Sequence, residues 1–157
     1  LCSDHNIKFV HISTDYVFDG EKETPYIEDD ETNPTSVYGL SKLSGEKKVL
    51  ANCPDATIIR TQWLYGHGGI NFITKITKIA REQGVAEVVN DQRGCPTYAK
   101  DIADPILLLI EKNRSGIYHV ANAGSCTWFD FAREIFSCLH IDAVSYTHLT
   151  LPTIYSV

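Results

Sequence analysis

The sequence lacks the features that mark nucleic-acid-binding and membrane proteins. It has no basic excess, because 14 Lys and Arg residues stand against 20 Asp and Glu residues, for a formal net charge of −6. A chain with this charge does not neutralise a phosphate backbone, so we expect no nucleic-acid partner. The longest apolar run, residues 106–110, is far shorter than the ~20 residues that a membrane-spanning helix needs, and no secretory signal opens the chain. We therefore expect a soluble protein of the cytoplasm.

Patterns typical of disulfide frameworks and zinc sites are also missing. The five cysteines are odd in number and widely spaced, with no C-x-x-C pair and no histidine at zinc-ligand spacing. We interpret them as reduced thiols and expect no metal site. What remains is ordinary globular composition, with 43% hydrophobic and 22% charged residues over 157 positions, which is enough for one core.

Strand-like and helix-like segments alternate along the chain. β-Rich runs predict strands over residues 7–12, 57–64, 85–89 and 117–121. Helical spacing of apolar residues predicts helices over residues 36–50, 72–83, 102–110 and from the Thr127/Asp130 capping box onward, while residues 19–34 form a loop. We expect Pro105 to kink its helix or to mark its start. This alternation predicts an α/β fold with parallel strand pairing.

Tyr38 and Lys42 are the first candidates for chemistry, because they lie four residues apart and share one face of the predicted helix. We expect the opposite face, with Leu40, Leu43 and Leu50, to pack against the protein. A phenol is a poor acid at neutral pH, and a nearby ammonium favours its ionised form. The pair could therefore transfer a proton to a carbonyl oxygen, although an ordinary surface pair has the same spacing.

Four motifs surround this pair in a fixed order: HISTDYVFDG at 11–20, NPTSVYGLSK at 33–42, RTQWLYG at 60–66 and NDQRGCPT at 90–97. In this order they resemble the dTDP-4-dehydrorhamnose reductases of the extended short-chain dehydrogenase/reductase family. The resemblance extends from Ile7 to about His140. It implies a partial Rossmann-type parallel sheet together with part of a smaller C-terminal substrate domain.

The resemblance also implies a role for each matching residue. Tyr38 would be the proton donor, Lys42 would hold the nicotinamide ribose of the coenzyme, and Thr14 would bond the reacting sugar oxygen. Asp15 and Trp63 would contact the substrate. Structural alternatives stay open: Thr14 and Asp15 could cap a strand and a turn, and Trp63 could belong to the core. Turn roles are favoured for three further residues, Asp91, Gln92 and Thr97.

The activity implied by the resemblance is reduction of dTDP-4-dehydro-L-rhamnose to dTDP-L-rhamnose by NADPH or NADH, for surface polysaccharide synthesis. The partner is then a dTDP-sugar, and the parent enzyme could be a homodimer. Two other interpretations remain. One is a related sugar-nucleotide epimerase or dehydratase, and the other is a non-catalytic binding module like the regulatory subunit of methionine adenosyltransferase.

The chain departs from the family pattern at both ends. The family begins with a strand, a Gly-rich turn and a helix that cradle the coenzyme pyrophosphate, and this sequence has no such turn. We expect residues 1–66 to be the later part of the Rossmann-type domain and residues 67–142 to be a partial substrate-binding region. Residues 144–157 contain no charged side chain, so we expect 143–157 to be a non-native tail. A fragment of this kind should be inactive by itself.

Overall fold

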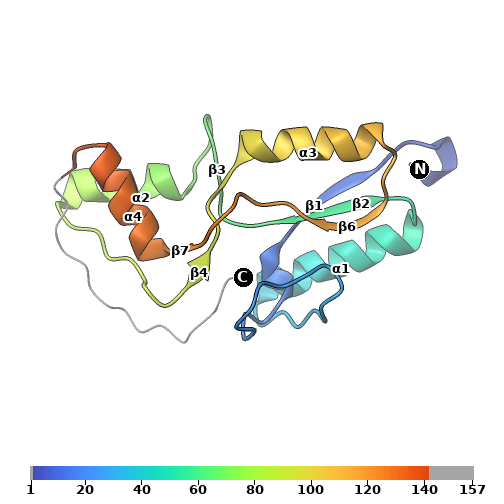
Figure 1. Cartoon of the computed structure of the whole chain (residues 1–157), viewed down its shortest axis with the longest axis horizontal. Coiled ribbons are helices and arrows are strands. Elements are labelled where there is room, and N and C mark those ends of the chain that lie inside the picture. The colour runs from blue at the N-terminus through green and yellow to red at the C-terminus, as the bar shows by residue number, and fades with distance from the viewer. Residues whose placement is uncertain (1, 142–157) are drawn as a thin grey trace.

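The computed structural model describes residues 2–141 and has an α/β architecture (Figure 1). Its helices are α1 (Val37–Asn52), α2 (Phe72–Gln83), α3 (Ala99–Glu111) and α4 (Trp128–Cys138), with short 3-10 helices at Ser3–His5 (η1) and Asp15–Val17 (η2). The strands are β1 (Val10–Thr14), β2 (Thr57–Thr61), β3 (Leu64–Tyr65), β4 (Arg93–Gly94), β5 (Thr97–Tyr98), β6 (Gly116–His119) and β7 (Cys126–Thr127). The expected fold class is confirmed.

A parallel sheet with the strand order β1-β2-β6 organises one half of the molecule. The middle strand β2 is buried along its whole length, which fits its β-branched, largely apolar sequence. In the pairing register, Ser13 lies beside Arg60 and Thr14 beside Thr61. The carboxyl ends of all three strands therefore meet at one edge, where parallel sheets place their ligand sites.

Helices α1 and α3 lie on opposite faces of this sheet (Figure 1). The Ser36 hydroxyl accepts a hydrogen bond from the Gly39 amide and so caps the start of α1. Gly39 also lies directly against the backbone of η2, because a Cβ at this position would be 2.1 Å from the Tyr16 carbonyl oxygen. The start of α1 is thereby held beside the end of β1.

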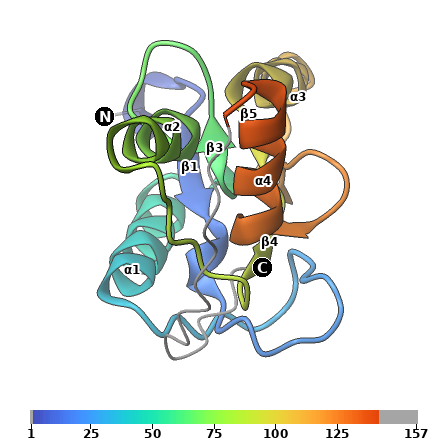
Figure 2. The ribbon, with the colours of Figure 1, turned by 90° about the vertical axis from the view of Figure 1, so that its left-hand side faces the viewer.

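The other half of the molecule is built from α2 and α4, with the short strands beside them (Figure 2). Both helices begin with a capping box, Asn71 with Thr74 and Thr127 with Asp130, and Gly84 ends α2 in the left-handed conformation. Apolar side chains from the two helices form a shared core with the segment between α2 and β4: Ile76, Ala80, Ala86, Val88, Ala132, Ile135 and Phe136. Strand β4 pairs with β7 antiparallel, and β3 pairs with β5 parallel.

Two local predictions are wrong, and one alternative for Pro105 is excluded. Residues 85–89 form no strand; Ala86 and Val88 pack into the core of α2 and α4, but the segment pairs with no strand within residues 2–141. Helix α3 begins at Ala99, so Pro105 lies inside it and does not mark its start, while the expected kink stays a prediction. The expected apolar face of α1 buries only Leu43, and Leu40 is 55% exposed. Burial therefore follows tertiary packing where the local pattern is ambiguous.

The predicted domain boundaries stay predictions, and the expected tail at 143–157 lies outside the described residues. Strand β6, from the second predicted range, pairs with β2 in the main sheet.

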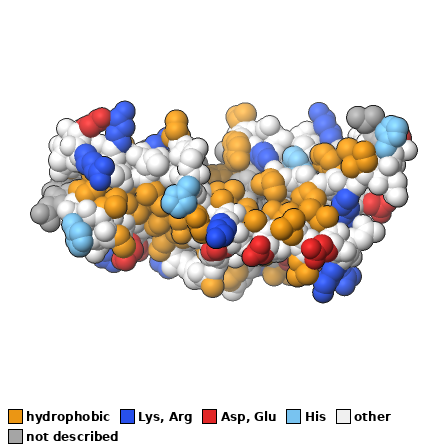
Figure 3. Space-filling model, turned by 90° about the horizontal axis from the view of Figure 1, so that it is seen from above, with side chains coloured by type: hydrophobic (Ala, Val, Ile, Leu, Met, Phe, Trp, Pro, Cys, Tyr) orange, Lys and Arg blue, Asp and Glu red, His pale blue; other side chains and the backbone are white. Residues whose placement is uncertain are grey.

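None of the helices within residues 2–141 is long and apolar enough to span a membrane. Hydrophobic side chains gather on the face seen in Figure 3. Among the large hydrophobic residues of α3, Leu107, Leu108 and Ile110 are exposed.

Candidate active site

Thr14 and Asp15 lie at the carboxyl end of β1, where the strand turns into η2. Their side chains are 6% and 7% exposed. The Thr14 hydroxyl donates to Oδ1 of Asp15 over 2.9 Å and accepts from the Tyr16 amide over 3.3 Å. Thr14 is therefore the capping residue of η2, and it lies at the edge where the strands end.

Asp15 has the most strongly altered carboxyl group at this edge. Burial raises the pKa of Asp15 to about 7, and the hydrogen bond from Thr14 opposes this rise only in part. Its second oxygen, Oδ2, has no hydrogen-bond partner. The carboxyl group can therefore exist as a neutral acid or as an anion near physiological pH.

Tyr38 and Lys42 approach the same strand end from α1. The Tyr38 ring meets the Tyr16 ring edge-on, with centroids 5.8 Å apart, and its side chain is 56% exposed. The Lys42 ammonium donates to the Ile12 carbonyl oxygen over 2.6 Å. The structure thus brings the predicted catalytic residues Thr14, Tyr38 and Lys42 to the end of β1.

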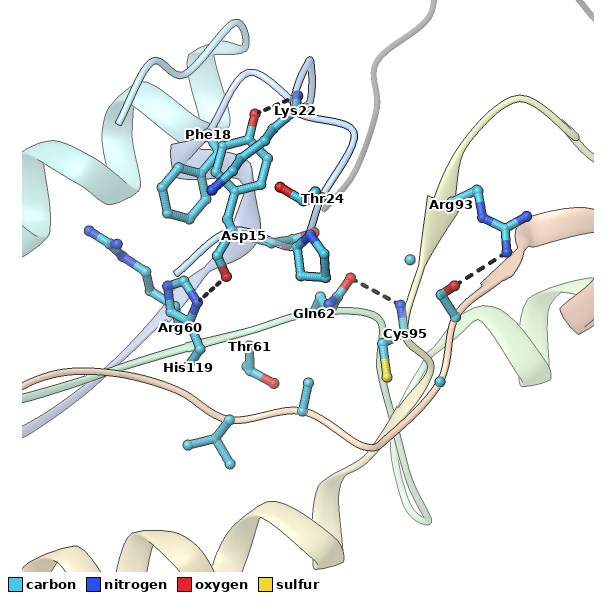
Figure 4. A pocket seen from close by; sticks show the side chains of 18 of the residues that line it. Asp15, Phe18, Lys22, Thr24, Arg60, Thr61, Gln62, Arg93, Cys95 and His119 are labelled. Carbon is cyan, nitrogen blue, oxygen red and sulfur yellow. Dashed lines mark hydrogen bonds between the residues drawn. The ribbon is translucent and has the colours of Figure 1, made fainter. Parts of the chain in front are cut away.

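A pocket of about 470 Å³ opens beside this end of the sheet (Figure 4). Several polar side chains line it, including Asp15, Arg60, Thr61, Gln62, Arg93 and His119. Four buried polar atoms among them have no hydrogen-bond partner: Asp15 Oδ2, Arg60 Nη1, Thr61 Oγ1 and His119 Nε2. Buried polar atoms in proteins are normally paired, so these four suit a polar ligand or ordered water.

Aromatic side chains and a neutral histidine form one side of the pocket. The rings of Phe18 and Tyr26 are stacked with centroids 4.3 Å apart, and His119 meets Phe18 edge-on at 5.6 Å. Burial lowers the pKa of His119, which favours the neutral imidazole. Its Nδ1 lies 3.3 Å from the Tyr26 carbonyl oxygen, so a proton on Nδ1 would leave Nε2 as an acceptor.

The structure does not bring Trp63 into this pocket. Its ring stacks on Trp128 at 3.5 Å between centroids and is 8% exposed. A Cβ at Gly94 would lie 2.3 Å from the Trp63 ring, so only glycine fits against its other side. The backbone of Trp63 is in the left-handed region, with φ of 44°. Its neighbour Gln62 lines the pocket instead and accepts a hydrogen bond from the Cys95 amide.

Glu46 was assigned no role from the sequence, although it and Gly45 belong to the residues that carry the resemblance. It lies four residues after Lys42 on α1, is 2% exposed, and forms a buried ion pair with Arg60 of β2. The available signal was its spacing, because Glu46 continues the series of every fourth residue that Tyr38 and Lys42 begin.

The described residues fit only the reactive end of a nicotinamide coenzyme. Tyr38 and Lys42 can face the nicotinamide and its ribose, whereas within residues 2–141 no strand of the main sheet leads directly through a Gly-rich turn into a helix. The Gly-rich stretch at 66–69 precedes α2, but Asn71 and Thr74 already bond to each other's backbone amides there. Within residues 2–141, no cluster of three His, Cys, Asp or Glu side chains could hold a metal ion.

Comparison with known proteins places these residues in a family. The family described as "RmlD substrate binding domain" matches residues 1–153. The dTDP-4-keto-6-deoxy-D-glucose reductase of Streptomyces niveus is 45% identical over 143 residues, which is 90% of this chain and 50% of that protein.

Two solved structures of reductases are also similar. The dTDP-4-dehydrorhamnose reductase of Clostridium acetobutylicum superposes with a TM-score of 0.91 at 41% identity, covering 99% of this chain and 58% of that one. The corresponding enzyme of Bacillus anthracis, solved in complex with NADP, has a TM-score of 0.90 at 38% identity, covering 99% and 57%. The chain spans about half the length of the curated relatives it matches. On this evidence the chain belongs to the RmlD substrate binding domain family.

Proposed function

We propose that this chain carries the catalytic residues of a reductase that converts dTDP-4-dehydro-L-rhamnose to dTDP-L-rhamnose with NADPH or NADH. The observation that carries the proposal is the placement of Tyr38 and Lys42 of α1 against Tyr16 and Ile12, which lie two residues to either side of Thr14 at the end of β1. The reductase names of relatives with 38% to 45% identity support it. They favour a reductase over the epimerase and the binding-module interpretations.

The reaction needs one hydride and one proton. The coenzyme supplies the hydride to C4 of the sugar when it is bound. We assign the proton to the Tyr38 hydroxyl, so that its O–H bond breaks while a new O–H bond forms on the sugar oxygen. The Lys42 ammonium stabilises the phenolate that remains and holds the coenzyme ribose.

Thr14 and Asp15 are proposed to orient the sugar. The Thr14 hydroxyl has one proton, and in this structure it donates that proton in a hydrogen bond to Asp15. To donate a hydrogen bond to the sugar oxygen instead, the hydroxyl must rotate away from Asp15. Because the pKa of Asp15 is about 7, its carboxyl group could be protonated, and a neutral acid tolerates the loss of the hydrogen bond from Thr14. Asp15 lines the pocket, and its buried Oδ2 has no hydrogen-bond partner, so this oxygen could accept a hydrogen bond from a sugar hydroxyl.

Trp63 has a weaker case as a substrate contact. Its contact with substrate stays a prediction from the resemblance, and its stacking on Trp128 supports a packing role outside the pocket. The homodimer and the cytoplasmic location also stay predictions. The dTDP-sugar partner follows from the names of the relatives alone.

A hybrid enzyme would test the proposed function. In this hybrid reductase, the chain replaces the matching segment of the Bacillus anthracis reductase, which supplies a coenzyme-binding segment. We expect it to oxidise NADPH only when dTDP-4-dehydro-L-rhamnose is present, and to release dTDP-L-rhamnose identified by NMR. The chain alone is the control and should show no turnover. A folded hybrid that binds NADPH but yields no reduced sugar would contradict the proposal.

A further inference from the structure

Glu46 is a charged residue in the middle of α1 that is almost completely buried. Its carboxylate accepts hydrogen bonds from the Ser13 hydroxyl, from Arg60 Nε at 3.1 Å and from Arg60 Nη2 at 2.8 Å. We call these three residues the Glu46 cluster. Ser13 and Arg60 are 4% and 5% exposed, so the whole cluster is inside the protein.

The Glu46 cluster ties the helix to two strands at once. Ser13 belongs to β1 and Arg60 to β2, and the two residues are direct neighbours in the parallel pairing. The Glu46 carboxylate therefore binds side chains at paired positions of two adjacent strands. A bidentate contact of this kind fixes direction as well as distance, because the guanidinium and the carboxylate are both planar.

The helical register links the Glu46 cluster to the reactive pair. Tyr38, Lys42 and Glu46 follow at intervals of four and form one stripe, with a rise of about 6 Å between successive members. Lys42 bonds to the carbonyl of Ile12, the residue directly before Ser13. Lys42 and Glu46 thus contact adjacent positions of the strand that ends in Thr14.

Apolar packing by itself leaves the position of α1 weakly determined. Only three of its 16 residues are buried, Gly39, Leu43 and Glu46, and Leu43 is the sole large apolar side chain among them. A buried ion pair can often be replaced by apolar residues without loss of stability. The directional contacts of the Glu46 cluster therefore fix the position of α1, which apolar packing on this helix does not.

We infer that Glu46 is a positioning residue. Through Ser13 and Arg60 it fixes the position of α1 along β1, so that Tyr38 and Lys42 lie where catalysis needs them relative to Thr14. This inference rests on the proposed function for its catalytic consequence. Glu46 itself touches no reacting atom and acts only through the helix that carries the reactive pair.

The test uses the hybrid reductase and two substitutions at one position. Glu46→Gln keeps the size of the side chain but removes the charge, and Glu46→Asp restores the charge on a shorter side chain. Glu82→Gln is the matched control, because it breaks an exposed ion pair with Lys78 on α2. Each variant is measured for thermal midpoint, kcat, the KM values of sugar and coenzyme, and its crystal structure.

We expect Glu46→Gln to lower kcat at least tenfold, with the sugar KM changed less than twofold, and to lengthen the contact between Lys42 and Ile12 beyond hydrogen-bonding distance. Glu46→Asp should recover part of the lost kcat, and Glu82→Gln should match the parent. If Glu46→Gln does not fold, Ser13→Ala removes the link to β1 alone and should lower kcat at least threefold.

A kcat equal to that of the parent in Glu46→Gln, or in Ser13→Ala where only that variant folds, would overturn the inference. So would a crystal structure of Glu46→Gln in which Lys42 still contacts the Ile12 carbonyl. Failure of the proposed function gives a different result, because the parent hybrid would then reduce no sugar. The Lys42 contact in the crystal would still decide whether Glu46 positions the helix.

Discussion

Replacing Asp15 with asparagine should change how stability depends on pH. Burial raises the pKa of Asp15 from 3.8 to about 7 in the folded protein, so the folded state holds this proton more tightly than the unfolded state does. Between these two values the folded state binds more protons, and its stability falls as pH rises. Above about pH 7 the carboxylate is charged in both states, and the loss is complete.

The size of this effect follows from the same shift. A difference of ~3 pKa units corresponds to about 4 kcal/mol of unfolding free energy, which is an upper limit for a side chain that is 7% exposed. In Asp15→Asn the amide oxygen can still accept the hydrogen bond from Thr14, and there is no charge to bury. The variant should therefore gain stability over the parent as pH rises, by up to about 4 kcal/mol.

Urea unfolding of the hybrid reductase and of its Asp15→Asn variant, from about pH 4 to about pH 8, measures this difference directly. All other titrating groups are common to both proteins and cancel. The exposed Asp104→Asn on α3 is the control for loss of a carboxylate. A stability difference that stays constant with pH, or one that shrinks as pH rises, would refute the reasoning.

Two further predictions concern α1, and both are measured in the hybrid reductase. Gly39→Ala should lower unfolding free energy by about 3 kcal/mol, because the new Cβ would lie 2.1 Å from the Tyr16 carbonyl oxygen. Gly45→Ala, whose Cβ would meet only His11 at 3.6 Å, should be neutral or stabilising in urea unfolding, and an equal loss for both would count against the close approach. Lys42→Ala should raise the coenzyme KM and lower kcat in steady-state NADPH oxidation. A change in thermal midpoint alone would instead indicate a surface pair.

Much of the candidate site could be predicted from the sequence because its residues lie on regular elements. Tyr38 and Lys42 share a helix face through their spacing, and Thr14 ends a β-rich run. The Thr127/Asp130 capping box and the stop at Gly84 were also local signals, and the structure confirms both. These features depend on nearest neighbours in the chain and need no knowledge of the fold.

The remaining features depend on contacts between distant segments. The pairing of Glu46 with Arg60 spans 14 residues and joins a helix to a strand, so no local pattern shows it. The stacking of Trp63 on Trp128 joins residues 65 positions apart and removes Trp63 from the pocket wall. The failed strand at 85–89 has the same cause, because Val88 is buried by α2 and α4 rather than by a ladder.

The role of Tyr38 as the proton donor is the central claim, and single-turnover reduction of dTDP-4-dehydro-L-rhamnose by the hybrid reductase tests it most directly. Tyr38→Phe keeps the ring that packs against Tyr16 and removes only the hydroxyl. Tyr118→Phe, which removes the hydroxyl that bonds to the Ser115 carbonyl, is the matched control. We predict a loss on the order of 10² or more for Tyr38→Phe and none for Tyr118→Phe. An unchanged rate in Tyr38→Phe would contradict the account.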